Sequence, residues 1–76
     1  MKKLDLHGVR HEDVRQEVIR FVEAHWNTDE IELEIITGYS PSMKRISGIV
    51  LDEYQLDYKV GDAIGVNKGF IRVTMP

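Results

Sequence analysis

Polar and apolar residues alternate at the start of the chain, where Leu4 and Leu6 are interleaved with Asp5 and His7. A period of two is typical of a β-strand that buries one of its faces. Gly8 follows directly and, because it has no Cβ atom, allows a tight turn. We therefore expect a strand with buried leucines, whose Asp5 and His7 side chains point away from the core at its carboxyl end.

The apolar spacing then changes to the three and four residues that are typical of an amphipathic helix. The pattern predicts a helix from His11 to Trp26, with Arg10 where a capping Ser or Thr is usual. Residues 27–29 are polar and end this helix. The side chains expected on its buried face are Val14, Val18, Phe21, Val22 and His25.

The alternation returns over residues 31–36, which predicts a second strand. Ser40 then precedes Pro41, as at the N-cap and first position of a second helix. Gly48 inside that helix costs about 1 kcal/mol relative to alanine, so we expect it to serve close packing. The covered face of the strand comprises Ile31, Leu33 and Ile35, opposite Glu32 and Glu34. The apolar face of the helix comprises Met43, Ile46, Ile49, Val50 and Tyr54.

The C-terminal part of the chain predicts two further strands. Tyr58–Val60 is a short strand that can extend to Ala63, Gly65–Gly69 is a turn, and Phe70–Met75 is rich in β-forming residues. The order β-α-β-α-β-β predicts an α/β fold, a two-layer α+β sandwich. Right-handed crossovers place both helices on one face of a four-stranded mixed sheet. We expect residues 1–76 to form a single domain.

Composition limits the classes of partner. The chain of 76 residues has no cysteine and a formal net charge of −3, so nucleic-acid binding requires a local basic patch. No apolar run is long enough to span a bilayer. We expect no membrane partner, and the lack of a signal peptide favours the cytoplasm. A monomer is the expected state, with weak self-association as the alternative.

Asp5 and His7 are the first candidates for chemistry. An imidazole ordinarily titrates near neutrality, which suits a general acid or base. Asp5 can orient His7 or bind a divalent cation such as Mg²⁺ or Mn²⁺. Alternatively, both side chains merely solvate an exposed sheet face, with Asp5 accepting a backbone N–H near the turn. The residues alone favour this second interpretation, because short motifs often match by chance.

A second candidate site follows the second strand, at Thr37, Gly38, Tyr39 and Ser40. A strand that enters a helix N-terminus through glycine can bind an anion with its N–H groups, although a simple serine-capped turn explains these residues equally well. Tyr39 is the better candidate for stacking on a base, because Trp26 is expected to pack at the end of its helix. The residues that can form a basic rim for a phosphate backbone are Arg10, His11, Lys44 and Arg45.

The run Leu4-Asp5-Leu6-His7-Gly8 before a helix, with Ile36-Thr37-Gly38 after the next strand, resembles the Smr (small MutS-related) domain. Ser40 stands where that family has the second glycine of its Thr-Gly-X-Gly motif. The resemblance implies a fold similar to the C-terminal domain of translation initiation factor three. It also implies binding to DNA or RNA and a nicking-type endonuclease that hydrolyses phosphodiester bonds, and it favours a functional interpretation of Asp5 and His7.

On this basis we expect His7 to be the catalytic acid or base, with Asp5 as its partner or as a metal ligand. The residues expected to bind nucleic acid or phosphate are Gly8, Arg10, Thr37, Gly38, Tyr39, Ser40, Lys44 and Arg45. Two alternatives remain at this point. One is a non-catalytic nucleic-acid-binding module, and the other is a protein-interaction domain that uses the open sheet face.

Overall fold

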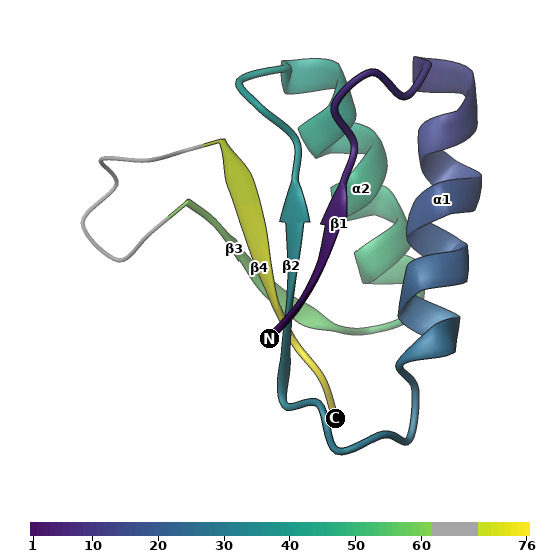
Figure 1. The fold of residues 1–76 in the computed structure, drawn as a ribbon, viewed down its shortest axis with the longest axis vertical. Coiled ribbons are helices and arrows are strands. Elements are labelled where there is room, and N and C mark those ends of the chain that lie inside the picture. The colour runs from purple at the N-terminus through teal and green to yellow at the C-terminus, as the bar shows by residue number, and fades with distance from the viewer. Residues whose placement is uncertain (62–68) are drawn as a thin grey trace.

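Strands and helices alternate along the chain in the predicted order (Figure 1). The structure is a computed structural model and describes residues 1–61 and 69–76. Its elements are β1 (Lys2–Asp5), α1 (His11–Ala24), β2 (Glu32–Ile36), α2 (Pro41–Glu53), β3 (Asp57–Val60) and β4 (Phe70–Thr74). The predicted extension to Ala63 and most of the predicted turn at Gly65–Gly69 lie outside the described residues.

The strands form one mixed sheet in the order β1-β2-β4-β3. β1 runs parallel to β2 with Asp5 opposite Ile36, whereas β4 is antiparallel to both β2 and β3. The helix α1 connects the parallel pair, as a crossover between parallel strands requires. Because β1 and β2 are parallel neighbours, the turns that follow them lie at the same edge of the sheet.

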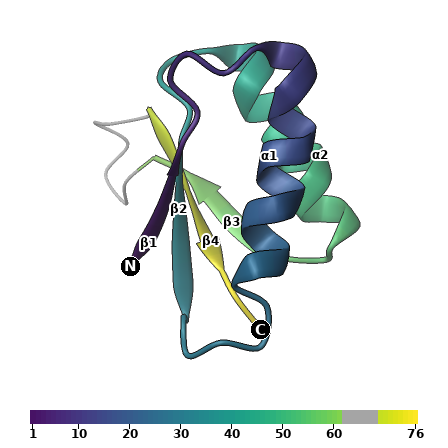
Figure 2. The same cartoon turned by 45° about the vertical axis from the view of Figure 1, so that its right-hand side comes forward.

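Both helices pack on one face of the sheet, and no helix or strand of the described residues covers the other face (Figure 2). This confirms the predicted two-layer arrangement. The two helices are joined by Arg15, whose guanidinium lies 2.7 Å from a Glu53 carboxylate oxygen, and by the Tyr54 hydroxyl, which donates to Glu23 at 2.8 Å. The buried apolar residues are Leu6, Val14, Val18, Phe21, Val22, Leu33, Ile35, Val50, Leu51, Leu56, Ile71, Val73 and Met75.

Two isoleucines that were expected in the core are at the surface. Ile31 is 74% exposed, and it directly precedes β2, which begins at Glu32. Ile49 is 48% exposed, and α2 instead buries Ser47, Gly48, Val50 and Leu51 toward the core. The first helix also ends at Ala24, two residues before the predicted Trp26.

Gly48 has the packing role that its position in a helix suggested. A Cβ atom built on Gly48 would lie 2.8 Å from the Tyr58 hydroxyl oxygen, which is closer than Cβ contacts allow. The absence of a side chain therefore lets α2 approach the ring of Tyr58 on β3. Burial, together with a hydrogen bond to Asp52, raises the pKa of Tyr58 above its ordinary value.

The uncovered face carries balanced charges in its middle row. Lys3, Glu34, Arg72 and Lys59 stand side by side across the four strands. Lys3 and Arg72 pair with the Glu34 carboxylate at 3.7 and 3.2 Å. Arg72 therefore compensates the charge of Glu34 on this face.

Candidate functional site

The turn after β1 exposes His7. The Val9 N–H donates to the Leu6 carbonyl at 3.0 Å and closes a four-residue turn. Gly8 occupies its third position with φ of 81°, a conformation that residues with a Cβ atom rarely adopt. The chain therefore leaves the sheet sharply just after Leu6, and the His7 side chain is at the surface.

Asp5 fixes the backbone of this turn. One oxygen of its carboxylate accepts the His7 backbone N–H at 2.8 Å, the local bond expected of an aspartate two residues before a turn. This is the alternative role that the sequence allowed for Asp5. The contact orients the backbone of His7, and the imidazole ring is not its partner.

The turn after β2 is closed by the sheet. The N–H groups of Thr37 and Gly38 both donate to the Gly69 carbonyl, at 3.0 and 2.9 Å, and the Thr37 hydroxyl donates to the Gly38 carbonyl at 2.9 Å. Thr37 is only 4% exposed. The expected anion site with free N–H groups is therefore corrected at these two residues, because both donors already have a protein acceptor.

Ser40 caps α2 as predicted. Its Oγ accepts the Met43 N–H at 3.2 Å, and Pro41 occupies the first turn of the helix. The hydroxyl hydrogen of Ser40 can still be donated to a ligand. Tyr39 is 73% exposed, and the Lys44 ammonium lies 5.5 Å from the centre of its ring. This places an aromatic face and a cation together at the surface.

The start of α1 differs because no side chain caps it. Arg10 occupies the N-cap position without a side-chain hydrogen bond to the helix, as the sequence indicated. Its guanidinium lies 3.5 Å from a Glu12 oxygen, and both side chains are largely exposed. The Asp13 N–H of this first turn donates to the Arg10 carbonyl at 2.9 Å. The N–H groups of the two residues before it, His11 and Glu12, have no side-chain cap and lie at the same edge of the sheet as His7.

The two turns meet at one edge. The Leu6 N–H donates to the Ile36 carbonyl at 2.9 Å, which aligns the last residues of β1 with those of β2. Both strand-to-helix turns lie at the same end of the molecule (Figure 1). This confirms that His7 and the Thr37-Gly38 turn follow neighbouring strands and that His7 is accessible. The exposed residues on this side include Gly8, Arg10, Tyr39 and Arg45.

The described residues do not form a complete metal site. No group of three His, Cys, Asp or Glu side chains within residues 1–61 and 69–76 is arranged to hold an ion. Asp5 could supply a single carboxylate ligand, and Mg²⁺ commonly combines one or two carboxylates with water and substrate phosphates. In the same part of the chain, no helix has the length and apolar character needed to cross a membrane.

Comparison with models of known protein families shows to which family the chain belongs. The family model of the Smr domain matches residues 4–61, which include both strand-to-helix turns. The chain belongs to the Smr domain family. Smr domains are known as nucleic-acid-binding and nuclease-like modules. Searches of curated proteins and of solved structures returned no significant match.

One contact of this Smr domain was not foreseen from its sequence. Gly69 precedes β4 and lies beyond the matched segment, yet its carbonyl accepts both N–H groups of the second turn. The only signal for this contact in the sequence was a glycine that precedes a segment rich in β-forming residues. Which turn that glycine would meet depends on the pairing of β4 with β2, and the sequence pattern does not specify this pairing.

Proposed function

We propose that this Smr domain binds DNA or RNA at the edge formed by its two strand-to-helix turns and hydrolyses a phosphodiester bond there. The observation that carries the proposal is the exposed His7 in a turn fixed by Asp5, beside the second turn of the family motif. A proton-transferring group at the same edge as cationic side chains is an arrangement that can support phosphodiester hydrolysis.

His7 supplies proton transfer in this proposal. When water attacks phosphorus, a P–O bond forms, the bond to the leaving oxygen breaks, and one proton must move from the water to the leaving oxygen. An imidazole can take the proton from the water or give one to the leaving group. The hydrogen bond from the His7 N–H to Asp5 fixes the backbone from which the ring projects.

Binding in this proposal is local and electrostatic. Arg10 at the start of α1 and Lys44 near the start of α2 flank the edge, and Arg45 extends the positive charge along α2. The N–H groups of His11 and Glu12 at the uncapped start of α1, together with the Ser40 hydroxyl, can donate to phosphate oxygens. Tyr39 offers an exposed ring for an unpaired base. These contacts would compensate for a net charge of −3.

A non-catalytic binding module is the second candidate, and the second turn favours it. The N–H groups of Thr37 and Gly38 are bonded to Gly69, so they stabilise the fold and are not available to stabilise charge on a phosphate. Binding through Arg10, Lys44 and Tyr39 does not depend on these N–H groups. The two candidates therefore share a ligand and differ in turnover.

A paired measurement separates the two candidates. Cleavage rate and dissociation constant are determined for the wild type and His7→Ala on branched DNA, single-stranded RNA and duplex controls, each with Mg²⁺, with Mn²⁺ and with chelator. We expect the cleavage rate of the variant to fall about 10²- to 10⁴-fold, the usual contribution of a general acid or base. We expect the dissociation constant to change only a few-fold.

The remaining outcomes each contradict part of the proposal. Equal losses of rate and affinity would make His7 a binding residue. Wild-type binding without cleavage under all three metal conditions would establish the non-catalytic module. Thermal unfolding of the variant serves as the control for its fold, and little change is expected because His7 is exposed.

A further inference from the structure

Among the residues that the structure describes, no strand pairs with the outer side of β1. β1 is an edge strand of the described sheet, with β2 as its one neighbour. The Leu6 N–H donates to Ile36, and in a parallel pair alternate residues face the neighbour. Leu4 therefore also directs its backbone toward β2, whereas the N–H and C=O groups of Lys3 and Asp5 point away from it. Such an edge is a template for a further strand.

The sequence of this edge is complementary to itself. If two copies pair antiparallel with Leu4 opposite Leu4, each Lys3 stands opposite an Asp5. Both of these residues have outward backbone groups, so each Lys3–Asp5 pair would exchange two backbone hydrogen bonds and bring opposite charges together. The registers shifted by two residues would place Lys3 opposite Lys3, or Asp5 opposite Asp5. Like charges disfavour both of those registers.

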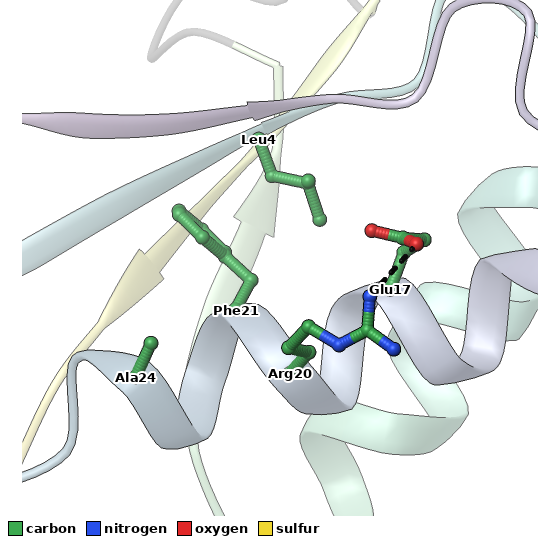
Figure 3. Close-up of a pocket in the computed structure, with 5 residues that line it drawn as sticks. All are labelled: Leu4, Glu17, Arg20, Phe21 and Ala24. Atoms are coloured by element: carbon green, nitrogen blue, oxygen red, sulfur yellow. Dashed lines mark hydrogen bonds and ion pairs between the residues drawn. The ribbon is translucent and has the colours of Figure 1, made fainter.

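An apolar hollow lies beneath the same strand. Leu4 is half-buried and, with Phe21 and Ala24 of α1, lines an open cavity of about 200 Å³ (Figure 3). The hydrogen-bonded pair of Arg20 and Glu17 borders it. In the register described above, the Leu4 side chains of two copies would meet at this cavity. Lysines on an edge strand usually oppose association, but here each Lys3 would meet an aspartate.

We propose that β1 is a self-association edge, through which two copies of this chain pair antiparallel along Lys3-Leu4-Asp5 and form one continuous sheet. The dimer is weak, because a single short strand pair buries less than the roughly 1,000 Å² of a stable interface. This proposal stands independently of nucleic-acid cleavage, because its measurement contains no nucleic acid.

The first test measures mass against concentration by sedimentation equilibrium, from micromolar to millimolar protein. We expect the wild-type mass to rise toward that of a dimer. Lys3→Glu should remain monomeric, because it places two carboxylates opposite each other twice. Lys59→Glu is the matched control, since it makes the same charge change in the same row of the open face but on the other edge strand. The control should associate like the wild type.

Exchanging the charges at positions 3 and 5 should restore the association. The double variant Lys3→Glu with Asp5→Lys restores opposite charges in the antiparallel register, so we expect it to regain the association that Lys3→Glu abolishes. A wild type that stays monomeric at millimolar concentration would overturn the proposal. Loss of association in Lys59→Glu with no loss in Lys3→Glu would also overturn it and would assign the interface to β3.

Cysteine scanning tests the register separately. The chain has no cysteine, so each single-cysteine variant reports on one position. In this register residue 4 faces its own copy as a non-hydrogen-bonded pair, with Cα atoms about 4.5 Å apart, which allows a disulfide. We expect Leu4→Cys to form a covalent dimer under mild oxidation well before Lys3→Cys or Asp5→Cys. Faster cross-linking at position 3 or 5 would contradict the register.

Discussion

The two strand-to-helix turns of this domain occupy equivalent places at neighbouring strands, but within the described residues only the second is bonded to the segment before β4. In the turn after β2, the N–H groups of Thr37 and Gly38 are bonded to Gly69, and Ser40 caps the following helix. In the turn after β1, His7 is exposed and Arg10 provides no cap. We call these the closed turn (residues 37–40) and the open turn (residues 7–10).

The difference indicates which turn mainly stabilises the fold and which turn can bind a ligand. Hydrogen-bond donors that already have partners contribute to folding, and they cannot stabilise charge on a substrate without first breaking those bonds. The open turn keeps its first helical N–H groups without a side-chain acceptor, which is unfavourable for the helix but favourable for an anion. We therefore expect changes in the closed turn to affect mainly unfolding, and changes in the open turn to affect mainly binding and turnover.

Capping residues give the largest expected effects on stability. Ser40→Ala removes the acceptor for the Met43 N–H and should lower the free energy of unfolding by about 0.5–2 kcal/mol. Arg10→Ser introduces a cap at α1 and should raise it by about 1 kcal/mol or less. Urea unfolding of both variants measures these changes.

The same pair of variants tests the assignment of chemistry. Arg10→Ser should weaken nucleic-acid binding, because it removes a cation and gives the α1 N–H groups an intramolecular acceptor. Ser40→Ala should weaken binding less, since it removes a single hydroxyl. If Ser40→Ala reduced affinity more than Arg10→Ser at matched folded fractions, the closed turn would be the main phosphate-binding element and the comparison would be reversed.

The basic residues of α2 have a smaller expected effect. Replacing Lys44 and Arg45 by alanine should weaken binding a few-fold near physiological salt. It should also flatten the slope of log affinity against log salt by about one unit for each phosphate that is no longer neutralised. Lys2→Ala with Lys59→Ala is the matched control, because it removes the same charge from positions away from the two turns. An equal flattening of the slope in both double variants would show that net charge matters and the location does not.

The parts of the fold that could be predicted are those set by local periodicity. Leu33 and Ile35 alternate with glutamates, and Val14 and Val18 recur at the spacing of a helix. All four are fully buried. The alternation failed at Ile31, which directly precedes β2, because the burial of a residue at the end of a strand depends on what the rest of the fold places over it. A pattern along the chain does not contain that information.

The position of the candidate site could be predicted from the sequence, but its hydrogen bonds could not. Strand alternation and the Gly8 turn place His7 at an exposed edge, and the Smr motif identifies the neighbouring turn. The bonds from Thr37 and Gly38 to Gly69 involve residues about thirty positions apart. They follow from the register of β4 on β2, which many distant interactions determine together. Sequence reasoning could therefore locate the second turn but could not show that it is closed.

Substitution of Asp5 by asparagine is expected to have the smallest effect, and it tests how the open turn is held. In the structure, the Asp5 carboxylate accepts the His7 backbone N–H at 2.8 Å, a role for which an amide oxygen serves almost as well. If Asp5 acts through this bond, Asp5→Asn should retain the cleavage rate within a few-fold, since asparagine also makes such turns. Asp5→Ala lacks the acceptor. It should lose about 1 kcal/mol of stability and a larger share of the rate.

The ratio of the cleavage rates of Asp5→Asn and Asp5→Ala identifies the role of Asp5. A metal ligand or a proton-transferring carboxylate needs its charge, so under either role Asp5→Asn would be about as inactive as Asp5→Ala. A residue that only orients the backbone needs its oxygen, so Asp5→Asn would resemble the wild type. Measuring both rates across a Mg²⁺ titration separates the two charged roles, because loss of a ligand is partly restored at high metal concentration and loss of a proton-transferring group is not. We expect Asp5 to act by orienting the turn. Asp5→Asn should then be active, and its cleavage rate should not change when metal is added.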